Sequence, residues 1–131
     1  MTGGLIVSHG DYGRGLLHAL EMIAGKQEKM AAVSLAEGEG LPDLLEKIRQ
    51  EIGKMDINDI FLFVDMFGAT PCNAASLLCS ECGFPVIAGA NLPVLLTFVL
   101  NRETEEKEVL LEQLSNAAKE GFRIVVKEDL I

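Results

Sequence analysis

The sequence has 131 residues, of which 49% are hydrophobic and 24% charged, and its formal net charge at pH 7 is −9. These values fit one globular domain and argue against binding to nucleic acid or to an anionic membrane surface, both of which attract clustered lysine and arginine. Apolar runs fall short of the ~18–20 residues that a membrane span needs, and three cysteines without framework spacing favour a reducing cytoplasm.

Short apolar runs alternate along the chain with longer segments of helical periodicity. The runs predict buried strands, and the periodic segments, several of which begin at proline or end before glycine, predict helices. In chain order we expect a strand over residues 5–7, a helix over 14–24, a strand over 30–35, a helix over 42–54, a strand over 60–64, a helix over 71–80, a strand over 85–88, helices over 91–101 and 108–120, and a last strand over 122–126.

This alternation predicts an α/β fold, a three-layer α/β/α sandwich around a mainly parallel five-stranded sheet of order 2-1-3-4-5. In that order the first and third strands are neighbours whose following helices cover opposite faces, and ligands bind at such a switch point, beyond the carboxyl ends of the strands. His9 ends the first strand and Asp65 ends the third. The topology therefore predicts a histidine and a carboxylate in one crevice.

His9 and Asp65 suit a nucleophilic histidine. An imidazole titrates near ~6.5, so it is neutral and available as a nucleophile at cytoplasmic pH. A carboxylate that accepts a hydrogen bond from one ring nitrogen fixes the tautomer in which the other nitrogen is bare. From the residues alone, His9 is also a candidate general base.

The segment 68–71 predicts an anion-binding turn at the start of a helix. Free backbone N–H groups and the helix dipole attract anions there, Gly68 permits close backbone approach, and Thr70 adds a hydroxyl. Ordinary helix capping, with Thr70 at the N-cap and Pro71 after it, explains the same residues. A nucleophilic histidine beside an anion turn favours phosphoryl transfer, which depends on positioning and electrostatics.

Nucleotide-binding loops of the types G-x-x-x-x-G-K-[ST] and G-x-G-x-x-G do not follow the first strand. Cys79 and Cys82 form a C-x-x-C pair without the second pair of ligands that a zinc site requires, and they lie at the end of a predicted helix. We therefore expect no metal and no cofactor, and we expect these thiols to be buried or inert.

Residues 5–10, 64–75 and 86–93 resemble, in order and spacing, enzyme IIA of the mannose/fructose/sorbose family of the bacterial sugar phosphotransferase system. The resemblance implies that the phosphocarrier protein HPr phosphorylates His9 on Nε2, and that Asp65 holds the other ring nitrogen. The phosphoryl group then passes to a histidine of enzyme IIB, and from there to sugar entering through the membrane subunits IIC and IID.

The resemblance also implies the surroundings of the site. Residues 1–131 are expected to form a single enzyme IIA domain without a fused IIB domain, in a cytoplasmic homodimer that exchanges an antiparallel fifth strand over 122–126 and does not insert into the membrane. The expected phosphate-binding residues are Gly10, Gly68, Ala69 and Thr70, where the family commonly has serine in place of Thr70. The expected partner contacts at the rim are Phe67, Arg14 and Asn91.

Other functions use the same residues. A related branch of the family serves as the phosphotransfer subunit of the dihydroxyacetone kinase that depends on phosphoenolpyruvate, and a regulatory module that binds partners according to phosphorylation state would also use His9. A signalling receiver with Asp65 as phosphoacceptor would need an acidic pair at the end of the first strand to hold Mg²⁺, where Ser8 and His9 stand. The sequence does not name the sugar.

Overall fold

The computed structural model describes residues 1–130 and consists, in chain order, of alternating strands and helices followed by two consecutive helices. Its elements are β1 (Gly3–His9), α1 (Tyr12–Ala24), β2 (Met30–Leu35), α2 (Leu41–Met55), β3 (Ile60–Val64), α3 (Thr70–Cys82), β4 (Val86–Ala88), α4 (Leu92–Asn101), α5 (Lys107–Gly121) and the 3-10 helix η1 (Lys127–Asp129). None of the helices within residues 1–130 is long and apolar enough to cross a membrane.

The four strands form one sheet of order β2-β1-β3-β4, in which every neighbouring pair is parallel. β1 and β3 lie at the centre, and Val7 of β1 is in register with Val64 of β3. All five residues of β3 are buried, as expected of a parallel strand that is covered on both faces. The predicted α/β class and the order of the first four strands are confirmed.

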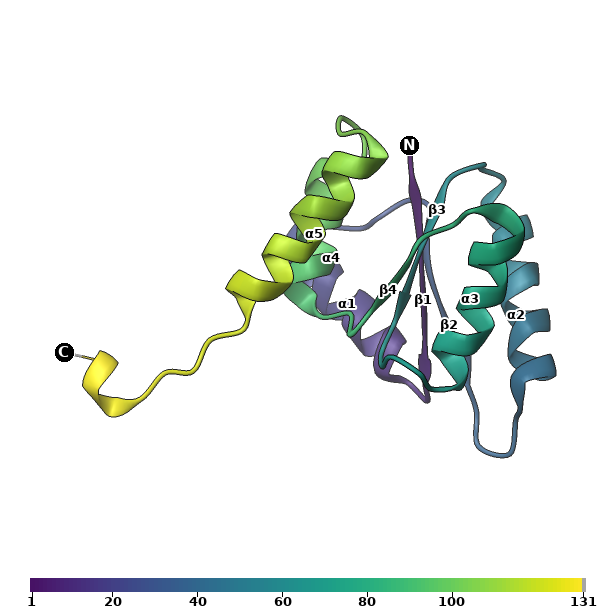
Figure 1. Ribbon diagram of the computed structural model, residues 1–131, viewed down its shortest axis with the longest axis horizontal. Coiled ribbons are helices and arrows are strands. Elements are labelled where there is room, and N and C mark those ends of the chain that lie inside the picture. Colours follow the sequence, from purple (N-terminus) through teal and green to yellow (C-terminus); the bar gives the residue numbers. More distant parts are fainter. Residues whose placement is uncertain (131) are drawn as a thin grey trace.

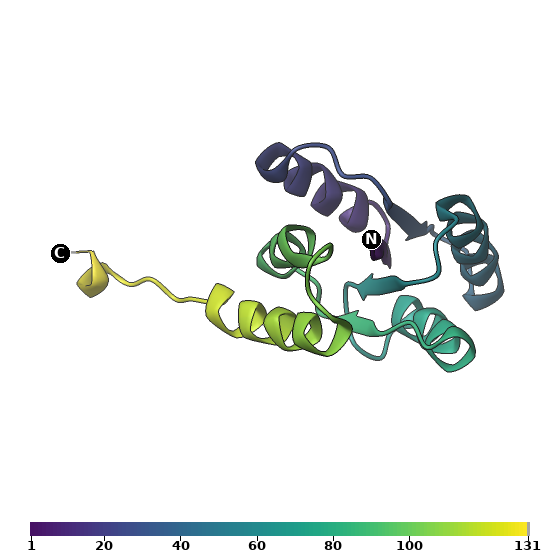
Figure 2. The same cartoon turned by 90° about the horizontal axis from the view of Figure 1, so that it is seen from above.

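Helices cover both faces of the sheet, so the chain has three layers (Figure 1, Figure 2). Because successive strand side chains point to opposite faces, Leu5 and Val7 pack with α2 and α3, whereas Ile6 packs with α1, α4 and α5. On the second face Phe63 and Phe98 meet edge to face, with ring centroids 4.9 Å apart. Burying each such side chain stabilises the fold by about 1.5–3 kcal/mol. This packing holds β1 and β3 in place, and their carboxyl ends carry His9 and Asp65.

Most predicted boundaries agree with the observed elements to within one or two residues. α1 begins at Tyr12, two residues before the predicted start, and α3 continues to Cys82, where Gly83 in a left-handed conformation (φ +76°) ends it. The N-cap of α3 is Ala69, and Thr70 is already the first helical residue. The prediction that Thr70 is the N-cap is therefore wrong, because Ala69 supplies the extended backbone at that position.

Residues 122–126 form no strand within the described part of this single chain. They leave α5 and run away from the sheet (Figure 1, Figure 2), and Phe122, Ile124 and Val125 are exposed. The direction in which α5 ends carries the segment away from β4, so it reaches no strand edge of its own chain. The described sheet has four strands, and the fifth, antiparallel strand stays a prediction.

Candidate functional site

His9 is the last residue of β1, and its side chain is 52% exposed at the carboxyl edge of the sheet. Asp65 follows β3 directly, and its side chain is 13% exposed. One carboxylate oxygen, Oδ2, accepts a hydrogen bond from the backbone N–H of His9 at 2.8 Å and lies 2.7 Å from its Nδ1. The structure thus brings together the two residues that the sheet topology places in one crevice.

The Asp65 contact selects one form of the imidazole. An ionised carboxylate only accepts hydrogen bonds, so a neutral ring bonded to it carries its proton on Nδ1 and leaves Nε2 bare. The same oxygen holds the His9 backbone, so the ring and the main chain are fixed relative to one group. Asp65 Oδ1 is buried and has no hydrogen-bond partner within residues 1–130. Chemically, this is a histidine prepared to act through Nε2.

The turn between β3 and α3 lies at the same edge of the sheet. Gly68 has a φ of +83°, a conformation that favours glycine, and a Cβ placed there would face open space. Asn73 N–H bonds to Ala69 O, whereas Thr70 and Cys72 stand earlier in the first turn, where backbone N–H groups have no acceptor inside a helix. This turn offers polar hydrogens and the positive end of a helix dipole to an anion.

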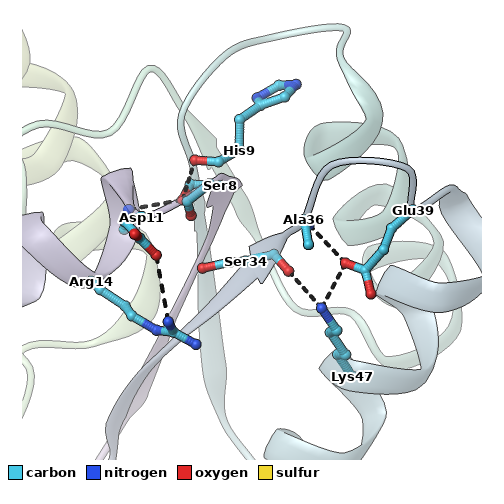
Figure 3. A network of polar contacts seen from close by, with 10 residues as sticks. Ser8, His9, Asp11, Arg14, Ser34, Ala36, Glu39 and Lys47 are labelled. Atoms are coloured by element: carbon cyan, nitrogen blue, oxygen red, sulfur yellow. Dashed lines mark hydrogen bonds and ion pairs between the residues drawn. The ribbon is translucent and has the colours of Figure 1, made fainter.

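The loop after His9 is held from several sides. Gly10 has a φ of +50°, and its N–H donates to Leu35 O at 2.9 Å on the neighbouring strand. Arg14 Nη1 lies 3.4 Å from Asp11 Oδ1, and both side chains are exposed. Figure 3 shows the His9 ring pointing away from Arg14. Arg14 therefore makes a local ion pair beside the site and does not contact His9 in this conformation.

An acidic loop over residues 36–39 forms one wall of a groove of about 480 Å³ beside His9, whose lining includes Leu35 and Ala36. Glu39 Oε1 accepts from Lys47 Nζ at 2.6 Å and from Ala36 N–H at 2.7 Å, and Lys47 Nζ also donates to Ser34 O (Figure 3). These hydrogen bonds, that of Lys47 above all, lower the pKa of Glu39. The groove could not be predicted from the sequence, because the Glu39–Lys47 contact that holds this loop joins it to a residue of α2.

The predicted rim residues have different environments. Phe67 is 85% exposed, whereas Asn91 caps α4, with its Oδ1 accepting from Val94 N–H at 3.0 Å. Sequence reasoning missed Tyr12, whose hydroxyl donates to Ala90 O at 3.0 Å and ties the first residue of α1 to the loop after β4. The signal that could have identified Tyr12 is an aromatic residue two positions after Gly10, the glycine that follows His9.

The cysteines differ in exposure. Cys72 is buried, whereas Cys79 and Cys82 are exposed free thiols. Of the two expected alternatives for this pair, burial is wrong, and inertness stays a prediction. Both lie in the last turn of α3, at the end of the helix remote from its N-terminal anion turn. Within the part of the chain that the structure describes, no group of three or more histidine, cysteine, aspartate or glutamate side chains is arranged to hold a metal ion.

The fold and the site define an α/β protein with a carboxylate-bound histidine at the switch point of a parallel sheet. Residues 3–115 match the family described as PTS system fructose IIA component, EIIA-man. The chain is 32% identical over 126 residues to the fructose-specific EIIA component of Bacillus subtilis, covering 95% of this chain and 86% of that protein. It is 33% identical over 127 residues to the mannose-specific EIIAB component of Escherichia coli, covering 94% of this chain and 39% of that protein.

Among solved structures, the phosphotransferase system component EIIA from Streptococcus agalactiae superposes with a TM-score of 0.87 at 30% identity, covering 95% of this chain and 97% of that one. The chain therefore belongs to the EIIA-man family of components of the sugar phosphotransferase system. Members of this family take part in phosphoryl transfer, and the resemblance drawn from the three sequence segments is confirmed.

The acidic loop gives a prediction about pH. The pKa of Glu39 is lowered in the folded chain from the ordinary value of 4.5, so its contribution to loop order is fully present above that value and is lost as pH falls through the lower, folded value. We expect the Ala36 amide resonance to titrate with a midpoint below 4.5 in NMR spectra. Glu39→Gln should abolish this titration, and the control Glu37→Gln should leave it. A midpoint at or above the ordinary value would contradict the prediction.

Proposed function

We propose that this chain is a phosphohistidine carrier of the sugar phosphotransferase system. It accepts a phosphoryl group from phospho-HPr on His9 and passes it to a histidine of enzyme IIB, for sugar uptake through IIC and IID. The observation that carries the proposal is the 2.7 Å contact between Nδ1 of a half-exposed His9 and Asp65. It leaves Nε2 bare on a surface that another protein can reach. Family membership supports the same chemistry.

The transfer follows from this geometry. The lone pair of His9 Nε2 attacks phosphorus while the phosphorus–nitrogen bond to the donor's histidine breaks, and the donor's ring keeps that electron pair. His9 becomes a phosphorylated imidazolium, and Asp65 stabilises its positive charge through Nδ1–H without taking the proton. Transfer to IIB is the same displacement in the onward direction, with His9 as the leaving group. Because the phosphoryl group is only relayed, no cofactor or metal is proposed.

The phosphate-binding residues of the proposal are Gly10, Gly68, Ala69 and Thr70. The left-handed backbone at the two glycines and the open space beside both of them support a close approach by phosphoryl oxygens. The N-terminus of α3 supplies N–H groups and a positive dipole end that need no reorganisation during transfer. Thr70, at the first helical position, adds a hydroxyl at this end of α3.

The proposed partner rim includes Phe67, Arg14 and Asn91. The exposure of Phe67 supports an apolar contact with a docked protein, and Arg14 adds a polar group at the start of α1. Asn91 contributes through the shape of the α4 cap rather than through a free side chain. We also propose that the carrier works in the cytoplasm, where HPr and the IIB subunit meet it.

Phosphoryl uptake is the direct test. After incubation with phosphoenolpyruvate, enzyme I and HPr, we expect the intact mass to rise by one acid-labile phosphate in the wild-type protein and not in His9→Ala. His18→Ala removes an exposed histidine of α1 and is the matched control, which should take up phosphate normally. Uptake by His9→Ala at the wild-type level would overturn the assignment.

The role of Asp65 is tested by Asp65→Asn. This variant keeps the shape of the side chain but loses the charge that selects the tautomer, so we expect it to fold and to accept phosphate at least about 10-fold more slowly. The rate is measured by quenched-flow transfer from phospho-HPr. Asp59→Asn, at the opposite end of β3, should transfer at the wild-type rate. An unchanged rate in Asp65→Asn would remove Asp65 from the mechanism.

We further propose that two copies exchange residues 122–126 as an antiparallel fifth strand. Four neighbouring apolar side chains support this: Phe122 is 74%, Ile124 74%, Val125 65% and Val126 48% exposed. β4 lies at the edge of the described sheet, and a groove of about 290 Å³ beside it is lined mainly by residues of β4, α4 and α5. An open strand edge is a template for pairing with a segment of another chain.

Light scattering at micromolar concentration tests the exchange. We expect a dimer for the wild-type protein and a monomer for Ile124→Asp combined with Val125→Asp, because charges on both faces of the strand oppose its burial. Met22→Asp combined with Ile23→Asp changes two neighbouring apolar residues of α1, which are 76% and 59% exposed. This control should stay dimeric. A monomeric wild-type protein would contradict strand exchange.

A further inference from the structure

Ser8 precedes His9 and is fully buried at the end of β1. Burying a hydroxyl lowers the stability of the fold unless the hydroxyl is hydrogen-bonded. Ser8 Oγ has partners both as an acceptor and as a donor. It accepts from Gly13 N–H at 2.8 Å, and its own hydrogen has two carbonyl acceptors nearby, His9 O at 3.2 Å and Gly10 O at 3.4 Å. The hydroxyl therefore joins the first turn of α1 to the backbone of the reactive residue (Figure 3).

The contact with Gly13 replaces an ordinary helix cap. The first N–H groups of a helix have no acceptor within it, and Asp11, which stands at the N-cap of α1, makes no capping bond with its side chain in the described structure. Ser8 supplies the acceptor from the end of the strand instead. The serine therefore holds both ends of the loop that leads from His9 into α1.

Gly13 lies where the first turn of α1 closely approaches Ser8 at the end of β1. A Cβ at this position would lie 2.9 Å from Ile6 Cγ2, closer than real Cβ atoms pack, and 3.0 Å from Ser8 Oγ, which is tighter than most real contacts. Any other residue at position 13 would push on the serine hydroxyl itself. The absence of a side chain at Gly13 lets α1 come within hydrogen-bonding distance of Ser8.

The result is a backbone held on both sides of His9. Its N–H bonds to Asp65 Oδ2, its carbonyl lies beside the Ser8 hydroxyl, and the next N–H, that of Gly10, bonds to Leu35 O. The direction in which the ring leaves the backbone sets whether Nδ1 reaches Asp65. Small errors in the position of a reacting group have large effects on rate.

We propose that Ser8, seated against Gly13, is the positioning residue that orients His9 on Asp65 and so selects the Nδ1–H tautomer. This inference rests on the proposed phosphohistidine function for its effect on rate. Its effect on the ring does not depend on any donor protein. Loss of the hydroxyl frees the His9 carbonyl and the start of α1, and the imidazole returns toward the mixture of tautomers of a free ring.

The test measures the tautomer of the His9 ring directly. It uses two-dimensional ¹⁵N NMR at a pH where the imidazole is neutral, with His18 as internal reference. In the wild-type protein we expect the Nδ1–H tautomer at His9, in Ser8→Ala a shift toward Nε2–H, and in Ser8→Thr, which keeps the hydroxyl, the wild-type pattern. Gly13→Ala, which crowds the hydroxyl without removing it, should shift the ring as Ser8→Ala does. Phosphoryl acceptance by Ser8→Ala should fall about 10-fold.

Ser34→Ala is the matched control. Ser34 is in register with Ser8 on the neighbouring strand, and its hydroxyl has no hydrogen-bond partner within residues 1–130, so its removal should change neither the ring nor the rate. Wild-type ring shifts in a folded Ser8→Ala protein would overturn the proposal, and so would Ser8→Thr behaving like Ser8→Ala. If Ser8→Ala does not fold, Ser8→Cys, of similar size with a weaker donor, is judged by the same shifts.

The His9 tautomer and the rate of phosphoryl acceptance are separate measurements. Together they distinguish the proposed phosphocarrier function from the positioning role of Ser8. A wild-type protein that takes up no phosphate, but whose His9 tautomer responds to Ser8→Ala, would overturn the proposed function and leave the positioning role in place. A wild-type protein that takes up phosphate, and whose ring and rate are both unaffected in Ser8→Ala, would overturn the positioning role alone.

Discussion

The site depends on a single carboxylate oxygen. Asp65 Oδ2 accepts from the backbone N–H of His9 and lies within hydrogen-bonding distance of its ring. A side chain that held the ring alone would leave the main chain free to move the ring elsewhere. Because both groups are bound to the same atom, the orientation of the histidine is set by the relative position of two strand ends. That position is fixed by the register of β1 and β3 at the centre of the sheet, so the chemistry of the site follows from the packing of the core.

The central elements were predictable because their signals are local. Apolar runs and helical periodicity determine where the strands and helices lie, and the topology of alternating elements then places His9 and Asp65 together without any knowledge of side-chain contacts. The glycines at positions 10 and 68 follow the same logic, since each stands where the backbone must turn with a positive φ.

The features that were not predictable depend on distant partners. The Ser8–Gly13 hydrogen bond requires knowing how closely α1 approaches the end of β1, and the Glu39–Lys47 pair requires knowing which turn of α2 faces the loop. The cap of α3 falls on Ala69, a residue without a capping side chain, because the backbone conformation decides it. Residues 122–126 have a strand-like composition, but a strand forms only where a second edge is available.

In the proposed phosphocarrier, the phosphoryl group on the exposed His9 nitrogen would also have to survive contact with water. The carboxylate that holds His9 is poorly suited to activate water, because Oδ2 is occupied by His9 and Oδ1 is buried. A freely exposed carboxylate at this position would orient His9, but it would also act as a base on water near the phosphoryl group. Because the Asp65 side chain is only 13% exposed, it orients His9 without acting on water. In the proposed carrier, the lifetime of the phosphorylated state would therefore depend in part on how deeply the fold buries the carboxylate that follows β3.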